Sequence, residues 1–225
     1  YKDFVNETLN SEGIVEKVTF KEDKFYNFAY DVVDRLAAEK PEKVAMVWCN
    51  EAGNEKIITF KEMKEYSDKT ASFFQSLGIK KGDAVMLILK RHYEWWYCMM
   101  ALHKIGAIAI PATNQLMAKD VVYRVNAASV KAIVCTSEGE ISNVVDEAQL
   151  ETETLKIKIL TRANKEGWLN YEEGISQASE FVAPTGDARP QAEEIMLMYF
   201  SSGTTGMPKM VAHNHYYSLA HIPTA

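Results

Sequence analysis

Short apolar runs alternate along this chain with segments in which apolar residues recur every three or four positions. The runs at 84–89 and 132–135 contain no charged residue, which is typical of strands that are buried on both faces of a sheet. Apolar residues at 93–105 and 120–128 follow helical spacing. Because strand-like and helix-like units alternate, we predict a layered α/β fold with mostly parallel sheets covered by helices.

The same pattern predicts further elements along the chain. Helices are expected near 25–36, 63–77, 141–148, within 168–178 and from about Asn214, and strands at 43–49, 56–60, 107–110, 157–160, 195–200 and 210–213. The two strands around the turn at 51–54 should form a hairpin, and Gly78 suits a left-handed helix cap. Residues 184–191 contain two prolines and a glycine and are the best candidate for a linker. A linker there predicts an N-terminal subdomain at 1–190 and the start of the next subdomain at 191–225.

Composition and charge narrow the classes of function. The net charge of −6 and the pI near 5.5 argue against a nucleic-acid-binding surface, because phosphate backbones attract clustered Lys and Arg. The longest apolar stretches are too short to span a bilayer, and no secretory signal opens the chain. Cys49, Cys98 and Cys135 each lie in an apolar context without a CxxC pair. We therefore expect buried, reduced thiols and a cytoplasmic protein.

The candidate chemistry lies near the C-terminal end, in the block Tyr199-Phe-Ser-Ser-Gly-Thr-Thr-Gly-Met-Pro-Lys-Met-Val211. Gly203 and Gly206 allow positive φ angles, so the backbone can approach an anion closely. Successive amides can then form a concave anion-binding nest, and Lys209 adds a positive charge. Hydroxyl donors come from Ser201, Ser202, Thr204 and Thr205. This loop is therefore predicted to bind a polyphosphate.

The loop differs from the nucleoside-triphosphatase motif, in which Gly precedes the Lys and Ser or Thr follows it. Here Pro208 precedes Lys209 and Met210 follows it. A flexible Ser/Gly/Thr linker is the alternative, but linkers usually have polar flanks, whereas apolar strand-like runs enclose this loop. Ligands of parallel α/β sheets gather at the carboxyl ends of the strands. A loop directly after the strand at 195–200 is therefore where an ATP site is expected.

The whole block resembles the phosphate-binding motif of the adenylate-forming superfamily, which includes acyl-CoA synthetases, peptide-synthetase adenylation domains and luciferases. The superfamily pattern ends in Ser-Gly-Thr-Thr/Ser-Gly, any residue and Pro-Lys, and every fixed position is met here. Two earlier segments are also similar to superfamily motifs, namely Ile58-Thr-Phe-Lys-Glu-Met63 and Ala101-Leu-His-Lys-Ile-Gly-Ala-Ile-Ala-Ile-Pro111. Both set helix–strand packing, so they support the fold and not the chemistry.

A finer resemblance is to medium-chain acyl-CoA synthetases. It rests on Glu94-Trp-Trp96, Pro111-Ala-Thr-Asn-Gln115, Tyr123-Arg124, Leu155-Lys-Ile157 and Gly167-Trp-Leu-Asn170. The resemblance covers nearly all of the chain and implies part of the large N-terminal domain of an adenylate-forming enzyme. The superfamily's later motifs, which bind adenine and ribose and deliver a catalytic Lys, would follow Ala225. We therefore expect a truncated chain that is inactive alone, and self-association through apolar surface that truncation exposes.

The resemblance implies a two-step reaction in the longer protein. A carboxylic acid reacts with ATP to give an acyl-adenylate and pyrophosphate, and coenzyme A then displaces AMP. The first step brings an anion toward a polyanion, so the phosphates must be neutralised and positioned. On this interpretation Lys209 screens phosphate charge and Thr204 lies near Mg²⁺. Ser201, Ser202, Gly203, Thr205 and Gly206 complete the loop that holds the ATP phosphates.

Three residues outside the loop are candidates for the substrate cleft. His213 ends the strand that leaves the loop, where several superfamily members keep a His or an aromatic residue near the acyl pocket; a structural or surface His is the alternative. Gln115 and Arg124 are candidates by resemblance only, and a solvated or salt-bridged Arg is the alternative for the second. His213, His215 and His221 could also suggest a metal site, but His213 and His215 share a strand face only if the strand continues that far.

The leading prediction is the N-terminal portion of an ATP-dependent carboxylic acid:CoA ligase for short- or medium-chain acids. An adenylation domain that loads a carrier protein is an alternative, and a neighbouring carrier domain in the parent gene would mark it. A non-catalytic interaction module is a second alternative, which would bind a protein but no ATP. A flavin or nicotinamide enzyme is not supported, because no GxGxxG follows a strand.

Overall fold

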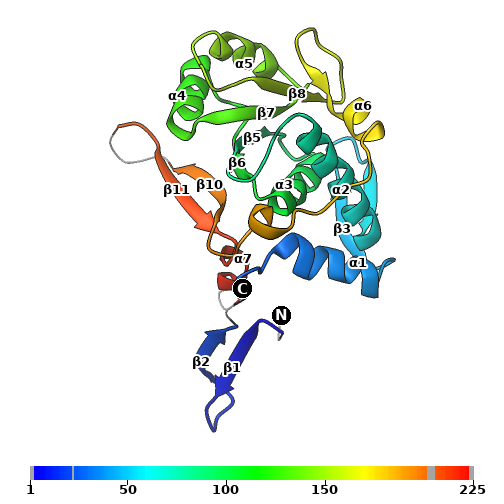
Figure 1. Ribbon diagram of the computed structural model, residues 1–225, viewed down its shortest axis with the longest axis vertical. Coiled ribbons are helices and arrows are strands. Elements are labelled where there is room, and N and C mark those ends of the chain that lie inside the picture. The colour runs from blue at the N-terminus through cyan, green and yellow to red at the C-terminus, as the bar shows by residue number, and fades with distance from the viewer. Residues whose placement is uncertain (1–2, 22, 202–205, 223–225) are drawn as a thin grey trace.

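The computed structural model of this protein describes residues 3–21, 23–201 and 206–222. Its centre is a seven-stranded sheet with the order β11-β10-β6-β5-β7-β8-β9 (Figure 1). All neighbouring strands pair in parallel except β10 and β11, which are antiparallel. The predicted α/β fold with a mostly parallel sheet is therefore confirmed. The strands of this sheet are β5 (Ala84–Ile88), β6 (Ile108–Pro111), β7 (Val130–Thr136), β8 (Ile157–Thr161), β9 (Leu169–Asn170), β10 (Ile195–Ser201) and β11 (Lys209–Asn214).

Helices cover both faces of this sheet, and the side chains of β5 show why. Val85 and Leu87 join the core cluster that contains residues of α2 and α3, whereas Met86 and Ile88 join the cluster that contains residues of α4 and α5. Successive strand residues point to opposite faces, so a strand without a polar residue needs cover on both. The helical segments are η1 (Ala29–Asp34), α1 (Arg35–Glu39), α2 (Phe60–Ser76), α3 (Glu94–Ile105), α4 (Ala118–Ala128), α5 (Ile141–Gln149), α6 (Tyr171–Ser176), η2 (Gly186–Ala188) and α7 (Tyr217–Ala220).

Helix α2 begins with a reciprocal pair of side-chain hydrogen bonds. The Thr59 hydroxyl accepts from the Glu62 amide at 3.2 Å, and the Glu62 carboxylate accepts from the Thr59 amide at 2.8 Å. These bonds satisfy amides that the first turn of a helix leaves without an internal partner. Gly78 follows the helix with a φ of +77°, so the predicted left-handed conformation is confirmed. The sequence Thr-x-x-Glu thus explains how this segment starts α2.

Two hairpins lie outside the central sheet. The predicted one consists of β3 (Val44–Cys49) and β4 (Glu55–Thr59). The other consists of β1 (Val5–Leu9) and β2 (Val15–Phe20), and it projects from the rest of the molecule (Figure 1). The sequence pattern had predicted no element before residue 25. Most residues of β1 and β2 are exposed, so no buried apolar run marks these strands in the sequence.

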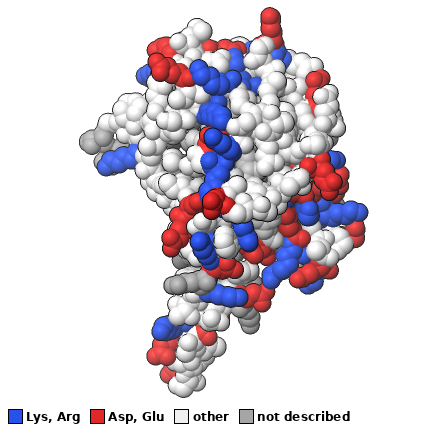
Figure 2. All heavy atoms as spheres, in the orientation of Figure 1, with Lys and Arg blue, Asp and Glu red and all other residues white. Residues whose placement is uncertain are grey.

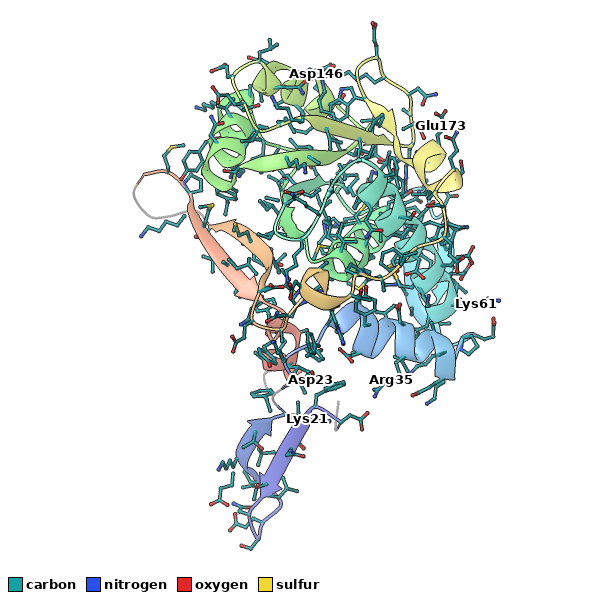
Figure 3. The ribbon with its side chains drawn as sticks, viewed as in Figure 1. Lys21, Asp23, Arg35, Lys61, Asp146 and Glu173 are labelled. Carbon is teal, nitrogen blue, oxygen red and sulfur yellow. The ribbon has the colours of Figure 1, made fainter. Side chains whose placement is uncertain are left out.

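The segment that follows the projecting hairpin is tied to the start of the C-terminal helix α7 by two tyrosines. The rings of Tyr26 and Tyr216 stack with their centroids 6.3 Å apart, and the Tyr216 hydroxyl donates to the Asp23 carbonyl at 2.9 Å. Asp23 lies where the hairpin joins the body of the molecule (Figure 3). The Tyr26 hydroxyl also lies 3.0 Å from the Ser218 hydroxyl. These contacts bring the two described ends of the chain together.

Cys49 lies on the surface, so the prediction of a buried thiol is wrong for this residue. It ends β3, and the outward face of the β3–β4 hairpin also leaves Val47 and Ile57 about 61% and 60% exposed. A two-stranded hairpin has only one face against the core, and alternate residues therefore meet water whatever their polarity. Cys98 and Cys135 are buried, as predicted.

Three other expectations concern membrane crossing, a nucleic-acid-binding surface and the boundary between subdomains. Across the described residues, no helix has the length and hydropathy that a membrane crossing requires. On the face in Figure 2, basic side chains form a narrow band down the middle of the upper body, and acidic and basic side chains are mixed below it. The predicted linker contains η2, and β10 continues the same sheet through its parallel pairing with β6. The division into subdomains at residue 190 stays a prediction.

Lys104 is a fully buried charge in the middle of the helical layer. Its side chain is 0% exposed, and its ammonium lies 2.7 Å from an Asp34 carboxylate oxygen and 2.6 Å from an Asp68 oxygen. It also donates to the Ser67 hydroxyl at 3.0 Å. Asp34 ends η1, Asp68 lies on α2 and Lys104 lies on α3. One cation therefore joins three helical segments.

His103, the neighbour of Lys104, faces His215 in the interior. The two imidazole centroids are 5.7 Å apart, and both residues are buried. Among the described residues, neither ring nitrogen of His103 has a hydrogen-bond partner. Nδ1 of His215 also has none among them. Burial, with a smaller contribution from His215, lowers the pKa of His103 from 6.5 to about 3. Burial lowers the pKa of His215 to about 4, against the opposing influence of Glu194. Both rings are therefore neutral at pH 7.

The Lys104→Met variant should be markedly less stable. Methionine fills a similar volume but leaves the Asp34 and Asp68 carboxylates without their common cation, and breaking a buried ion pair costs about 3 kcal/mol. Chemical denaturation monitored by circular dichroism would measure the change in the free energy of unfolding. The exposed Lys61 on α2 supplies the control, because Lys61→Met should change stability by less than about 0.5 kcal/mol. Equal stability of the two variants would contradict this prediction.

The histidine pair should make the protein less stable as the pH falls below neutrality. Both imidazoles bind protons more readily in the unfolded chain, since their folded pKa values of about 3 and about 4 lie below the usual 6.5. Their contribution is complete above pH 6.5 and is lost as the pH falls toward those values, at roughly 2 kcal/mol per histidine by pH 5. Denaturation curves at pH 7 and pH 5 would measure this loss. The His103→Gln, His215→Gln double variant should lose much less; an equal loss would contradict the assignment.

Candidate functional site

The predicted phosphate loop (residues 201–206) connects two paired strands at the edge of the sheet. Its first residue, Ser201, pairs with Lys209 at the last register position of the β10–β11 hairpin. The Ser201 hydroxyl also lies 3.4 Å from the Lys209 carbonyl, to which it donates. Strand β10 is parallel to β6, with Leu197 opposite Ala109. The loop therefore follows the carboxyl end of a parallel strand, where the sequence analysis expected it (Figure 1).

The described parts of the loop carry two of the predicted features. Gly206 has a φ of +95°, and a Cβ at this position would meet no atom within 4 Å. Its left-handed backbone is the conformation that an anion-binding nest requires. Lys209 is exposed, and its ammonium forms no ion pair with any described residue. Four predicted loop residues, Ser202, Gly203, Thr204 and Thr205, lie outside the described residues.

Helix α4 contacts both ends of the loop. The Tyr123 hydroxyl donates to the Pro208 carbonyl at 2.7 Å, and the Tyr123 ring meets Phe200 edge to face with centroids 6.1 Å apart. The guanidinium of Arg124 lies 5.3 Å from the Phe200 ring centroid. Arg124 also donates to the Asp120 carbonyl at 3.0 Å, so it is held against its own helix. The structure thus places Arg124 beside the base of the loop.

The other two candidates for the substrate cleft are His213, which lies on the β10–β11 hairpin, and Gln115, which follows the carboxyl end of β6. Gln115 is exposed in the segment between β6 and α4, and its backbone N–H donates to the Thr113 hydroxyl at 3.3 Å. His213 lies on β11, half-buried, with its ring 4.0 Å from that of Tyr217 and 5.9 Å from that of Tyr199. Contact of either residue with a substrate stays a prediction.

The histidines near the C-terminal end do not form a metal centre among the described residues. Strand β11 ends at Asn214, so His215 lies beyond the strand and turns into the core. His213 and His221 instead lie on either side of Tyr217 in an aromatic cluster, with the Tyr217 and His221 centroids 4.5 Å apart. In the described ranges no three His, Cys, Asp or Glu side chains are placed to hold a metal ion.

A polar cavity that the sequence did not suggest lies at the carboxyl end of β8. It has a volume of about 450 Å³ and contains no residue of the predicted site. Its lining includes Tyr93, Glu94, Arg162, Asn164, Asn170 and Glu172. Arg162 binds the buried Glu94 carboxylate through two nitrogens, at 3.0 and 2.8 Å, and its backbone has a φ of +64°. The signal in the sequence that could have revealed this cavity is Arg162, a charged residue directly after the buried strand β8.

The Arg162–Glu94 pair holds two of the charged side chains of this cavity against each other. A bidentate guanidinium–carboxylate pair fixes both side chains, and the Arg162 amide donates to the Glu172 carboxylate at 2.9 Å. The Arg162 guanidinium also lies 5.0 Å from the Tyr93 ring centroid. The Arg162 and Glu94 charges are therefore satisfied by each other, whereas Glu172 adds a carboxylate whose Oε1 has no hydrogen-bond partner among the described residues. The exposed Lys209 beside the loop is, by contrast, available to an anion.

Comparisons with known proteins agree with this architecture. Acyl-coenzyme A synthetase ACSM4, mitochondrial, of Mus musculus is 37% identical over 200 residues, which cover 85% of this chain and 33% of that protein. Acyl-coenzyme A synthetase ACSM3, mitochondrial, of Homo sapiens is 32% identical over 223 residues, which cover 93% of this chain and 37% of that protein. The chain therefore spans about a third of the length of these curated relatives.

A solved structure shows the same fold. The anthranilate CoA ligase AuaEII in complex with anthranoyl-AMP matches with a TM-score of 0.73 and 21% sequence identity, over 86% of this chain and 36% of that one. The model of the family described as AMP-binding enzyme matches residues 33–224. These findings confirm the predicted resemblance to the adenylate-forming superfamily. The chain belongs to the AMP-binding enzyme family.

Proposed function

We propose that this chain is the N-terminal, phosphate-binding portion of an ATP-dependent carboxylic acid:CoA ligase. The observation that carries the proposal is the β10–β11 hairpin. Its first strand pairs in parallel with β6, and its turn contains Gly206 in a left-handed conformation three residues before the exposed Lys209. Relatives that cover most of the chain are named acyl-coenzyme A synthetases. Because the chain spans about a third of those relatives, we assign the full reaction to a protein that also contains the remaining segments.

The proposed first step forms a bond between a carboxylate oxygen and the α-phosphorus of ATP and breaks the bond to pyrophosphate. The leaving group gains negative charge, so the protein must hold and neutralise it. Lys209 supplies a cation at the start of β11, and the amide of Gly206 supplies a donor in a nest. Ser201, Ser202, Gly203, Thr204 and Thr205 complete the proposed phosphate-binding set. In the second step the CoA thiolate forms a thioester at the acyl carbon and AMP leaves.

Magnesium accompanies ATP in this proposal. Oxygen ligands suit Mg²⁺, and the loop sequence is rich in hydroxyl groups, so its chemistry fits a metal–nucleotide complex. Thr204 is the residue that we propose lies near the ion. When bound, Mg²⁺ would screen charge on the phosphate oxygens. The protein's own part is to hold Lys209 and the loop backbone in place.

The acid would bind next to the same hairpin. His213 lies between Tyr199 and Tyr217, and this aromatic cluster offers an apolar wall of the kind that a short or medium acyl chain requires. Gln115 and Arg124 are the further cleft residues that we propose. Arg124 lies beside Phe200 at the base of the loop, which supports a place close to the reacting groups.

The compartment and the assembly are part of the proposal. The three cysteines are unpaired, which supports a reducing compartment. We propose that this compartment is the cytoplasm. The named relatives, by contrast, are described as mitochondrial. Cell fractionation would distinguish the two. Self-association stays a prediction: Met210 and Val211 on the edge strand β11 are 44% and 42% exposed, and size-exclusion chromatography would reveal the assembly.

ATP–pyrophosphate exchange tests the proposal directly. A full-length protein that contains this chain should exchange pyrophosphate in the presence of an acid between acetate and decanoate. Lys209→Ala should lower kcat/KM for ATP about 30-fold, the effect of losing one charge-assisted contact. Lys61→Ala is the matched control, since Lys61 lies on α2 far from the β10–β11 hairpin (Figure 3). A folded protein that gives no exchange with any acid would refute the ligase proposal.

A further inference from the structure

The backbone directly before Lys209 is fixed by a side chain from another element. Pro208 is the first residue outside the β10–β11 ladder, whose last register pair is Ser201 with Lys209. Proline has no backbone N–H, so its carbonyl is its only backbone hydrogen-bonding group. That carbonyl accepts the Tyr123 hydroxyl at 2.7 Å. A single hydrogen bond from α4 therefore restrains the peptide group that joins Pro208 to Lys209.

The opposite end of the loop meets the same part of α4. Phe200, the residue before Ser201, and the Tyr123 ring pack in a T-shaped arrangement with an interplanar angle of 72°. The Arg124 guanidinium covers the Phe200 ring at 5.3 Å. Adjacent helix residues point about 100° apart, so Tyr123 and Arg124 approach the hairpin from two directions. The end of β10 and the residue that precedes β11 are thus held by neighbouring residues of one helix.

Helix α4 is itself firmly anchored, so it can position what it touches. Val121 and Val125 on its inner face are both 0% exposed. Its first turn is closed by the Asp120 carboxylate, which accepts from the Met117 amide at 3.1 Å. Groups that act on a reacting substrate need supports whose own positions are fixed by packing. Tyr123 therefore connects the phosphate loop to the packed core of the molecule.

We propose that Tyr123 is a positioning residue for ATP binding, which holds Pro208 so that Lys209 and the end of the loop meet the phosphates in a fixed geometry. This inference rests on the proposed function. Tyr123 does not touch the nucleotide in this proposal and acts through the Pro208 carbonyl. A point charge such as that of Lys209 stabilises phosphate charge only at the right distance, and small misplacements have large effects on rate.

The Tyr123→Phe variant isolates the hydroxyl, because it retains the ring that packs against Phe200. Hydrogen–deuterium exchange on the 225-residue chain should show about fivefold faster exchange in a peptide spanning residues 201–209, the effect of one lost hydrogen bond. Tyr30→Phe is the matched control: the Tyr30 hydroxyl also donates to a backbone carbonyl, that of Lys104, at 3.0 Å. Tyr30→Phe should leave exchange in 201–209 unchanged. Unchanged exchange in Tyr123→Phe would overturn the proposal.

Kinetics of the full-length protein separate positioning from general stability. In ATP–pyrophosphate exchange, Tyr123→Phe should raise KM for ATP about fivefold and leave KM for the acid unchanged, and Tyr30→Phe should change neither. Faster exchange in the loop with an unchanged KM for ATP would overturn the positioning role. A wild-type protein without activity toward any acid would refute the ligase function, whereas the hydrogen-exchange comparison would still show whether Tyr123 holds the loop.

Discussion

The central strands are excluded from water on both faces, and this constraint determines where the protein can place polar chemistry. Strand β5 sends alternate residues into two separate apolar clusters. A polar side chain in the middle of such a strand would lose its hydration without gaining a partner. Ligand-binding groups must therefore lie where the strands end. The parallel order brings those ends to one edge, and the proposed phosphate loop, the Gln115 segment and the Arg162 cavity all follow a strand at this edge.

Among the described residues, the helical layer holds buried polar groups either in pairs of opposite charge or as neutral side chains. Lys104 is fully buried but has carboxylates from two other segments within 2.7 Å. His103 and His215 solve the same problem differently, since burial lowers the pKa of each and keeps both rings neutral. Both solutions connect elements that are distant in sequence. The carboxylates fix α3 relative to η1 and α2, while His215 places the chain after β11 against the same helix.

The sequence was sufficient to predict most of the elements after residue 25 and the two strands on either side of the loop, because these depend on local patterns. Wholly apolar runs predicted the strands, helical spacing predicted the helices, and the Gly- and Ser-rich turn directly after a strand predicted the loop at the sheet edge. The β1–β2 hairpin and the exposed Cys49 escaped prediction because their environment depends on which face of a hairpin meets solvent. The partners of Lys104 also escaped it. Nothing local marks Asp34 and Asp68 as the carboxylates that fold onto this cation.

The contact between α4 and the loop shows a further limit of motif-based prediction. A motif names the residues that meet the phosphates but not the residues that hold the motif in place. Gly206 and Lys209 are exposed, and glycine-rich backbone has many alternative conformations. The geometry of such a loop must therefore come from its neighbours. Tyr123 and Phe200 are far apart in the chain yet in contact, and only the folded sheet brings them together. In this chain the proposed phosphate-binding sequence and its proposed support thus come from different elements, β10–β11 and α4.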